Sequence, residues 1–336
     1  MRPQQTFLVI QTAFLGDLVL ATAVVEKLKS CYPQSKIDFL VKKENANVLA
    51  NNPNLNRVYT FDKDKKYAEL FRLLKEIRSQ KYSYVINLQR FASTGFLTAF
   101  SGGNQTVGYN KNPFSFLFSK RISHKVDGKH EVERNQLLIE SITDNVPAMP
   151  KIYPSTVDFD FVDRFTNAPF VTIAPASVWF TKQWPFKKWV ELILNIQPEI
   201  KVYLLGGPSD IDLCQSISAL LQNRKNIEIL AGKLTILQSG ALMKFAQMNF
   251  VNDSGPMHLA SAMNAPVTAI YCSTVPEFGF GPLSDIKKIV EHKGLACRPC
   301  GLHGLKSCPL GHFKCAENIG FKEVLQGSTL LQIGNN

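Results

Sequence analysis

The sequence predicts an α/β fold with two Rossmann-like domains, and two observations carry this prediction. Short apolar segments typical of buried strands alternate with segments whose apolar residues recur at helical spacing. The alternation stops in a proline-rich segment at residues 143–160 and begins again near residue 170. Strands that alternate with helices form a parallel sheet covered by helices, so each half predicts one domain, and the two are expected to face a cleft.

Each expected element follows from its local pattern of apolar residues and turn residues. In the first half, strands are predicted at 7–11, 37–41, 57–61 and 82–88, and helices at 18–29, 67–79 and 131–142. In the second half, strands are predicted at 170–175, 201–207, 227–230, 250–253 and 266–272, and helices from about 187, at 209–222 and at 241–248. The predicted domains therefore span residues 1–150 and 151–336, the second with a cysteine-rich tail.

Length and charge limit the class of protein. A chain of 336 residues suits two domains of roughly 150 residues each. The formal net charge of +11 favours an anionic partner: a nucleotide, a phosphorylated lipid surface or a nucleic acid. The N-terminal apolar stretch is interrupted by Gln11, Gly16 and Asp17 and has no signal-peptide cleavage site, which predicts a cytoplasmic protein. No stretch reaches the about 18 apolar residues of a membrane span, so any membrane contact is expected to be peripheral.

Asp17 lies in FLGDLV, between the first predicted strand and the helix that follows it. One interpretation is an ordinary helix cap, because an acid at a helix N-terminus accepts backbone N–H groups and suits the helix dipole. The other is a functional carboxylate, because α/β sheets bind ligands at the carboxyl ends of their strands. The local sequence alone favours the cap.

The densest signal lies at residues 251–274, where a strand ending in Asn252 and Asp253 runs through Ser254 and Gly255 into a helix. A glycine that allows close backbone approach, followed by a proline in the first helical turn, predicts a phosphate site at the helix N-terminus. The alternative is a tight turn and cap with no ligand. His258, taken singly, is better interpreted as a half-buried histidine than as a ligand.

A second signal follows the strand predicted at 170–175. Ser177, Thr181 and Lys182 place two hydroxyls and a cation at the carboxyl end of a strand, and lysine is a mobile charge suited to a diphosphate. Trp184 and Trp189 are spaced as core residues that anchor the next helix.

Other phosphate and metal motifs are weak or absent from the sequence. Gly206 and Gly207 form a GG turn, which is weak on its own. Neither GxGxxG nor GxxxxGK[ST] occurs, which argues against a nicotinamide dehydrogenase and a P-loop NTPase. Two DxD pairs, at 62–64 and 158–160, are interpreted as a solvated turn and a strand face rather than as Mg²⁺ ligands.

Four segments, in order, resemble glycosyltransferase family 9, whose heptosyltransferases move ADP-heptose onto the lipopolysaccharide inner core: QTAFLGDLVLATAVVEKLK, SVWFTKQWP, GGPSD and NDSGPMHLASAMNAPVTAIY. The resemblance extends from about residue 7 to residue 316. It implies a GT-B fold in which the first domain mainly binds the acceptor and the second binds the nucleotide sugar. It also implies an inverting transferase at the cytoplasmic face of the inner membrane, with ADP-heptose and a lipid A-core acceptor as partners and no cofactor needed for catalysis.

The resemblance implies roles for individual residues. Asp17 matches the family's catalytic base, which takes a proton from the acceptor hydroxyl as that hydroxyl attacks the anomeric carbon. Lys182 matches the lysine on the donor phosphates, and backbone N–H groups at Ser254, Gly255 and Met257 are expected to stabilise the leaving ADP. The predicted donor-binding residues are Ser177, Thr181, Lys182, Gly206, Gly207, Asp210, Asp253, Ser254, Gly255, Met257 and His258.

The donor and the acceptor are less readily derived. Ser209 and Asp210 stand where some family members carry a glutamate expected to grip the ribose, so the alternative is a family 9 transferase with another nucleotide sugar or acceptor. Residues 112–130 interleave aromatic and basic residues, which fits either contact with lipid A phosphates and the anionic leaflet or a solvated loop with a few core phenylalanines. The predicted acceptor-binding residues are Gly16, Asn87, Gln89, Arg90, Lys120 and Arg121.

Four of the seven cysteines crowd near the C-terminus, at Cys297, Cys300, Cys308 and Cys315. Four thiolates within reach of one another suit a structural Zn²⁺, although the spacing is not that of a standard zinc ribbon. A rival class is therefore a nucleic-acid-binding protein with a four-cysteine zinc site. The lysines are spread along the chain and no recognised nucleic-acid module occurs, which favours the enzyme and no nucleic-acid partner.

Overall fold

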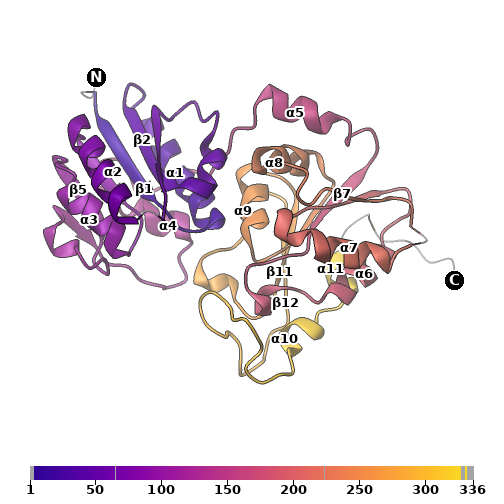
Figure 1. Cartoon of the computed structure of the whole chain (residues 1–336). Coiled ribbons are helices and arrows are strands. Elements are labelled where there is room, and N and C mark those ends of the chain that lie inside the picture. The colour runs from indigo at the N-terminus through magenta and orange to yellow at the C-terminus, as the bar shows by residue number, and fades with distance from the viewer. Residues whose placement is uncertain (1–3, 65, 223, 327–329, 331–336) are drawn as a thin grey trace. The chain divides into compact units, whose positions relative to one another are not determined.

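The computed structural model describes residues 4–64, 66–222, 224–326 and 330. The chain divides into two compact units, Met1–Tyr153 and Pro154–Asn336, and each contains one six-stranded sheet (Figure 1). The outermost residues of the two predicted domains, 1–3 and 331–336, lie outside the described residues.

Unit 1 contains a parallel sheet with the strand order β3-β2-β1-β4-β5-β6. Its central strand β1 reads TFLVIQ and is buried from its second residue onward, as expected for a strand with helices on both faces. The strands span Thr6–Gln11 (β1), Lys36–Lys42 (β2), Arg57–Phe61 (β3), Tyr84–Asn87 (β4), Gln105–Tyr109 (β5) and Lys120–Ile122 (β6). The α-helices span Leu15–Cys31 (α1), Lys66–Gln80 (α2), Ala92–Phe100 (α3) and Glu131–Gln136 (α4).

Unit 2 repeats this topology, with the parallel order β12-β11-β10-β7-β8-β9. Its strands span Phe170–Ala174 (β7), Lys201–Leu204 (β8), Ile227–Ile229 (β9), Asn249–Asn252 (β10), Val267–Tyr271 (β11) and Lys287–Glu291 (β12). Its α-helices span Thr156–Asp163 (α5), Phe186–Leu194 (α6), Ile211–Ala219 (α7), Ile236–Phe245 (α8), Gly255–Ala262 (α9), Lys314–Glu317 (α10) and Phe321–Leu325 (α11).

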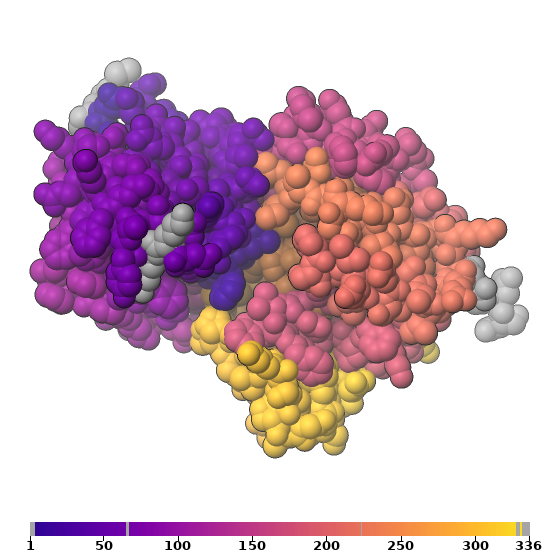
Figure 2. Space-filling view, in the orientation of Figure 1, coloured from indigo at the N-terminus to yellow at the C-terminus, as the bar shows by residue number. Residues whose placement is uncertain are grey.

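The core of unit 2 joins the sheet to the C-terminal helices. Trp184 and Trp189 are both buried, with ring centroids 4.9 Å apart in an edge-to-face arrangement, so their predicted role as core residues is confirmed. Trp184 donates its indole N–H to the Ile319 carbonyl at 3.3 Å, and Cys315 lies in the same core. The C-terminal segment, yellow in Figure 2, is thus part of the packed body of unit 2.

The strand order of each sheet reverses at one point. The reversal lies between β1 and β4 in unit 1 and between β7 and β10 in unit 2. In such sheets the loops after the two strands on either side of the reversal diverge to opposite faces, which leaves a hollow at the carboxyl edge where ligands bind. The segments that follow β1, β4, β7 and β10 contain most of the residues that the sequence singled out. Gly206, Gly207 and Asp210 instead follow β8, and Lys120 and Arg121 lie in β6.

Several predicted elements differ from the structure. The helix predicted at 241–248 is α8, which begins five residues earlier and ends at Phe245. Residues 158–160, interpreted as a strand face, lie in helix α5, because Ser155 caps that helix and the Asp158 carboxylate accepts the Ser155 backbone N–H at 2.8 Å. The two aspartates alternate in sequence, but Asp158 forms a capping box with Ser155 and so begins a helix. The helix predicted at 131–142 is α-helical only over α4, after which the chain continues in turns.

Candidate functional site

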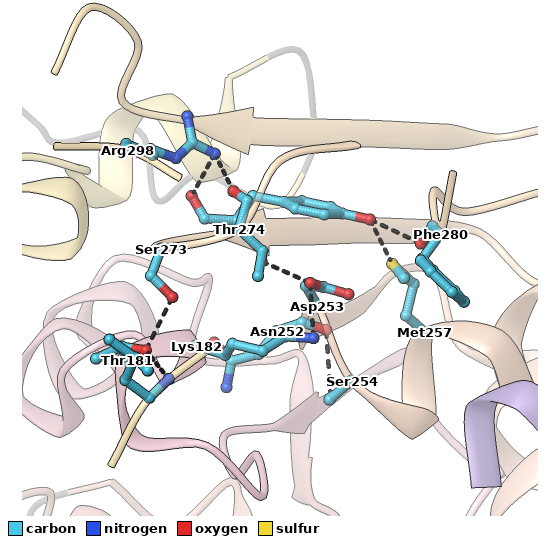
Figure 3. A network of polar contacts seen from close by, with 12 residues as sticks. Thr181, Lys182, Asn252, Asp253, Ser254, Met257, Ser273, Thr274, Phe280 and Arg298 are labelled. Carbon is cyan, nitrogen blue, oxygen red and sulfur yellow. Dashed lines mark hydrogen bonds and ion pairs between the residues drawn. The ribbon is translucent and has the colours of Figure 1, made fainter. Parts of the chain in front are cut away.

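An ion pair between a partly buried lysine and a buried aspartate marks the carboxyl edge of the second sheet. Lys182 ends a short 3-10 helix, η3 (Phe180–Lys182), in the connection after β7, and Asp253 directly follows β10. The Lys182 Nζ atom lies 2.7 Å from Asp253 Oδ2, and the two side chains are 15% and 7% exposed (Figure 3). Because β7 and β10 pair with each other at the strand-order reversal, two segments distant in sequence meet there.

Asp253 has a second partner, from the connection after β11. Thr274 is buried and donates its hydroxyl to Asp253 Oδ2 at 2.6 Å (Figure 3). One carboxylate oxygen therefore accepts from both an ammonium and a hydroxyl, and hydrogen bonds to an ionised group are stronger than neutral ones. Through Asp253, Thr274 helps to fix the position of Lys182.

Asn252 ties the connection after β7 to the end of β10. Its side-chain oxygen accepts the Trp184 backbone N–H at 3.0 Å, and its side-chain nitrogen donates to the Pro175 carbonyl at 2.7 Å. The side chain is fully buried, so these two hydrogen bonds satisfy polar atoms that would otherwise be costly. The loop that contains Ser177 and Lys182 is consequently anchored at both ends.

The Thr181 side chain joins the same loop to two further segments. Its hydroxyl oxygen accepts from the Ser273 hydroxyl at 2.9 Å and from the Leu305 backbone N–H at 2.7 Å (Figure 3). Thr181 is only 1% exposed. The structure therefore places this predicted donor-binding hydroxyl beneath the surface, where it supports the loop.

Arg298 supports the end of β11 from the C-terminal segment. Its guanidinium donates to the Thr274 carbonyl at 2.5 Å (Figure 3). It also forms an ion pair with Glu291 at 2.7 Å. The Arg298 and Glu291 side chains are 5% and 10% exposed, so this is a buried pair whose charges compensate each other.

The N-terminus of α9 lies directly beyond Asp253. Ser254 is the N-cap in an extended conformation, and Gly255 begins the helix. The first amides of a helix have no intrahelical acceptor, which makes them available to an anion. Met257 differs from the prediction: its N–H donates to the Ser254 carbonyl at 3.1 Å, and its fully buried side chain accepts from the Tyr271 hydroxyl at 3.5 Å.

The other predicted donor-binding residues have varied surroundings. Asp210 accepts the Gly207 N–H at 2.8 Å, and a side chain on Gly206 would place its Cβ 2.7 Å from the Asp210 Cβ, so these three residues form one closed turn. Ser177 is half-buried, and its carbonyl accepts from the Gln183 side chain at 2.6 Å. His258 is 4% exposed and packs edge-on against the Phe280 ring, with centroids 6.5 Å apart.

Asp17 lies at the reversal point of the first sheet. The N-cap of α1 is Phe14, so Asp17 is not the capping residue and instead occupies the third helical position, half-buried. Gly16 lies just before it in the same first turn. A carboxylate in the first turn is stabilised by the helix dipole in either case. Its placement after β1 puts the carboxylate at the carboxyl edge of the sheet, and its role as a functional carboxylate stays a prediction.

The end of β4 supplies polar side chains beside the end of β1. Gln89 donates to the side-chain oxygen of Gln11, and its own side-chain oxygen lies 3.5 Å from the Thr12 hydroxyl. Asn87 is fully buried and its side-chain oxygen accepts the Gln89 N–H at 2.9 Å. The predicted acceptor residues Asn87 and Gln89 are therefore held by the sheet, whereas Arg90 is exposed.

A buried charge cluster lies near Asp17 in unit 1. Glu131, at the start of α4, forms an ion pair with Arg134 at 2.7 Å, and their side chains are 9% and 4% exposed. Burial raises the pKa of Glu131, Arg134 opposes that shift, and the charge of Asp17 adds to it. The remaining predicted acceptor residues, Lys120 and Arg121, lie on edge strand β6, half-buried and exposed respectively.

Within the described residues, no three His, Cys, Asp or Glu side chains are grouped closely enough to hold a metal ion as they stand. All four clustered cysteines are free thiols. Across the same part of the chain, no helix is long and apolar enough to cross a bilayer.

Sequence reasoning missed the residues that support Lys182 from other segments. Ser273 and Thr274 carry a weak signal, because two hydroxyl residues follow the strand predicted at 266–272. Arg298 and Leu305 carry no local signal, since their contacts arise only when the C-terminal segment folds back onto the sheet.

Comparison with known proteins assigns the chain to a family. The sequence model of glycosyltransferase family 9 (heptosyltransferase) matches residues 70–306, more than half of the chain. The chain belongs to glycosyltransferase family 9. This family 9 chain is 28% identical over 282 residues to lipopolysaccharide heptosyltransferase 3 of Escherichia coli, covering 78% of this chain and 82% of that protein. It is 24% identical to the lipopolysaccharide core heptosyltransferase OpsX of Haemophilus influenzae, and the match covers 84% of this chain and 83% of that protein.

Solved structures agree with this assignment at the level of the fold. The structure of Escherichia coli ADP-heptose lps heptosyltransferase II superposes with a TM-score of 0.79 at 22% identity, over 95% of this chain and 96% of that one. The Escherichia coli heptosyltransferase WaaC with ADP gives a TM-score of 0.68 at 18% identity, over 84% of this chain and 92% of that one. The predicted family, GT-B fold class and enzyme class are confirmed, and the nucleic-acid-binding alternative gains no support.

Proposed function

We propose that this family 9 glycosyltransferase transfers a heptose from ADP-heptose to a sugar of the lipopolysaccharide inner core, with inversion at the anomeric carbon. The observation that carries the proposal is the Lys182–Asp253 pair at the strand-order reversal of unit 2, beside the N-terminus of α9. A cation and helix amides at one edge of a sheet are suited to a diphosphate. The names of the relatives, which are heptosyltransferases acting on lipopolysaccharide, support the choice of sugar and acceptor class.

Unit 2 is proposed to bind the nucleotide sugar. The Lys182 ammonium and the first amides of α9, at Ser254 and Gly255, bind the two phosphates and stabilise the negative charge that develops on departing ADP. Asp253 keeps Lys182 oriented and prevents an excess of positive charge before the donor arrives. The closed turn of Gly206, Gly207 and Asp210 follows β8, the strand next to β7. Its glycines allow the backbone to come close to the bound nucleotide sugar.

Unit 1 is proposed to bind the acceptor and to supply the base. Asp17 accepts the proton of the acceptor hydroxyl while the hydroxyl oxygen forms a bond to the anomeric carbon. The bond between that carbon and the phosphate oxygen breaks on the opposite side, and ADP leaves with the bonding pair. A positioned general base contributes about 10²–10⁴-fold to such a step. Asn87, Gln89 and Arg90 offer amide and guanidinium groups to the hydroxyls and phosphates of the core oligosaccharide.

The same unit is proposed to touch the anionic cytoplasmic leaflet of the inner membrane. Phe96 lies at the centre of an aromatic cluster, with ring centroids 5.1 Å from Phe100, 6.1 Å from Phe114 and 6.3 Å from Phe71. Phe71 is 66% exposed. Arg78 donates to the Phe100 carbonyl at 2.9 Å, which places a cation beside exposed aromatic rings, a combination suited to the interface of an anionic bilayer.

Nucleotide titration followed by a transfer assay tests the proposed reaction. Isothermal titration with ADP, UDP and GDP, without added divalent metal and again with Mg²⁺, should show selective binding of ADP in both conditions. ADP-heptose with a heptose-deficient core lipopolysaccharide should then give a product whose mass is increased by one heptose. Preference for UDP or GDP would overturn the donor assignment and favour the alternative of a family 9 transferase with another nucleotide sugar.

Membrane contact needs a separate experiment. The full chain should sediment with vesicles that contain anionic lipid and remain in the supernatant with vesicles of phosphatidylcholine alone. Phe71→Ser should weaken the sedimentation, whereas Tyr203→Phe, a change buried in unit 2, should not. Equal sedimentation of the Phe71→Ser variant and the wild type would show that the aromatic cluster is not the surface that contacts the membrane.

A further inference from the structure

The guanidinium of Arg298 holds the ends of two strands at the carboxyl edge of the second sheet. It donates to the carbonyl of Tyr271, the last residue of β11, at 3.4 Å, and to the carbonyl of Thr274 at 2.5 Å. It also donates to the His292 carbonyl at 3.3 Å and pairs with Glu291, the last residue of β12, at 2.7 Å. One side chain from the C-terminal segment therefore joins β11 to β12, its neighbour in the sheet.

Thr274 is the residue through which this arginine reaches the proposed donor site. The Thr274 carbonyl accepts from Arg298, while the Thr274 hydroxyl donates to Asp253 Oδ2 at 2.6 Å (Figure 3). A threonine side chain turns about a single bond, and its branched β-carbon restricts that rotation. The position of the main chain at Thr274, which Arg298 holds, therefore sets where the hydroxyl points.

The hydroxyl changes what Asp253 offers to Lys182. Asp253 Oδ2, which accepts from Thr274, is also the oxygen that lies 2.7 Å from Lys182 Nζ. A donor hydrogen bond to a carboxylate oxygen stabilises its negative charge, so the oxygen holds the ammonium in a fixed direction but less tightly. Because a bound phosphate competes with Asp253 for Lys182, this weaker hold favours movement of the ammonium to the phosphate.

Another arginine of unit 2 shows what a purely architectural contact looks like. The Arg224 guanidinium donates to three backbone carbonyls at or just beyond the C-terminal end of α6, at distances of 2.6, 2.8 and 3.1 Å. Those hydrogen bonds satisfy carbonyls that the end of a helix leaves without a partner. Arg298 differs from Arg224, because its acceptor residue Thr274 itself donates to the Asp253 carboxylate.

We propose that Arg298 is a positioning residue for Lys182, and that it acts through the hydrogen bond that Thr274 donates to Asp253. Glu291 belongs to the same arrangement, because its carboxylate holds the guanidinium from the end of β12. Neither Arg298 nor Glu291 is proposed to touch the nucleotide sugar. The inference rests on the proposed function, in which Lys182 binds the donor phosphates.

Arg298→Lys tests the geometry of the guanidinium. Lysine keeps the positive charge beside Glu291, but an ammonium group lacks the planar fork that holds several acceptors at once. Calorimetric titration should show severalfold weaker ADP binding, and the KM for the nucleotide sugar should rise by a similar factor while the KM for the acceptor stays unchanged. Arg224→Lys makes the same exchange at the end of α6 and should keep the wild-type ADP affinity. Equal ADP affinities of the two variants would overturn the proposal.

Combined substitutions test the route through Thr274. Thr274→Val removes the hydroxyl and should weaken ADP binding severalfold, whereas Thr274→Ser, which keeps the hydroxyl, should retain most of the affinity. In the Thr274→Val background, Arg298→Lys should cause little further loss, because the hydrogen bond that it positions is already absent. Losses that multiply in the double variant would contradict a route through Thr274.

Glu291→Gln supplies a second variant if Arg298→Lys does not fold. Glutamine has nearly the shape of glutamate but no charge, so it should hold the guanidinium less firmly and weaken ADP binding in the same direction. The other Glu291 oxygen lies 3.4 Å from the exposed Lys293 ammonium. Lys293→Met removes only this surface pair and should leave the ADP affinity unchanged. Equal affinities of the Glu291→Gln and Lys293→Met variants would contradict the role given to Glu291.

Unfolding measurements separate this inference from the proposed function, because they need no donor. Urea unfolding compares the loss of stability caused by Arg298→Lys in the wild type and in Lys182→Met. The loss should be smaller in Lys182→Met, because the ion pair that Arg298 positions is already absent. Equal losses in the two backgrounds would overturn the inference whether or not the chain binds ADP. Unequal losses in a chain that binds no ADP would support the positioning of Lys182 and count against the proposed function.

Discussion

The Lys182 ammonium lies 2.7 Å from a carboxylate oxygen of Asp253, and that oxygen also accepts the Thr274 hydroxyl at 2.6 Å. The pair lies at the point where β7 and β10 adjoin, with Asp253 buried and Lys182 partly buried, so a phosphate that binds there must compete with Asp253 for Lys182. A carboxylate next to the cation keeps the empty site electrically balanced, because an isolated buried charge is costly. Upon donor binding, the lysine is already close to where the phosphates are proposed to lie.

Replacing Lys182 with alanine should weaken ADP binding by about 1.5–3 kcal/mol, the range for a hydrogen bond to a charged group. The same change leaves Asp253 without its cation, so the free energy of unfolding should also fall. Lys187→Ala, which removes an equal charge from an exposed position five residues along, is the matched control. Calorimetric titration of both variants with ADP checks the prediction. Equal ADP affinities of the Lys182→Ala and Lys187→Ala variants would show that Lys182 does not bind the donor.

Replacing Thr274 with valine should lower the free energy of unfolding by about 1.5–3 kcal/mol, because it removes a buried hydrogen bond to a carboxylate. Thr274→Ser keeps the hydroxyl and loses only one methyl group, so it should cost about 1 kcal/mol. Urea unfolding of the wild type and both variants measures these differences. If serine and valine were equally destabilising, the hydroxyl would not be what stabilises this position.

Replacing Asp17 with asparagine should reduce turnover by about 10²–10⁴-fold, the contribution of a positioned general base. ADP affinity should stay at the wild-type value, because Asp17 belongs to unit 1 and the proposed phosphate site to unit 2. Asp160→Asn alters an exposed carboxylate on α5 and serves as the control. Steady-state kinetics with ADP-heptose and core acceptor test this role, and normal turnover of the Asp17→Asn variant would exclude Asp17 as the base.

His124 should make stability depend on pH. Burial, together with the nearby charges of Arg90, Arg134 and Lys111, lowers the pKa of His124 from its usual value of 6.5 to about 4. The folded state therefore binds fewer protons than the unfolded state between these values, and stability falls as the pH drops through that window. The side chain packs edge-on against Tyr109 with centroids 4.9 Å apart, so phenylalanine is a suitable replacement.

Urea unfolding across this pH range tests the assignment. The stability of His124→Phe should change less with falling pH than that of the wild type. His292→Phe, in unit 2, should keep the wild-type dependence. A steep loss of stability in the His124→Phe variant would show that another group accounts for the acid sensitivity.

The sequence predicted much of the fold because local periodicity is strong in parallel α/β domains. The strand at 57–61 was predicted with the bounds that β3 has, and the strand at 170–175 ends within one residue of β7. The error at residues 158–160 has a local cause: the aspartates alternate in a way that fits a strand, but Ser155 and Asp158 form a capping box that begins a helix. Strands β5, β6 and β12 were not predicted, because their sequences QTVGY, KRI and KKIVE lack the longer apolar run that marks a buried strand.

The candidate site was predicted as separate pieces. Lys182 was selected because it follows a predicted strand. Asp253 was selected because it ends another predicted strand, just before a helix that begins with a glycine. Thr181 was selected for its hydroxyl, but burial and two hydrogen bonds make it a support for the loop. Met257 was selected for its backbone N–H, which the structure pairs with the Ser254 carbonyl.

By itself, the sequence determined the two α/β units, the family and the segments that carry Asp17, Lys182 and Asp253, because periodicity and short motifs are properties of neighbouring residues. Only the tertiary structure decided that Asp253 pairs with both Lys182 and Thr274, and that Leu305 contacts Thr181. The physical reason is the parallel sheet, which aligns the carboxyl ends of β7, β10 and β11 and so brings together residues that lie far apart along the chain.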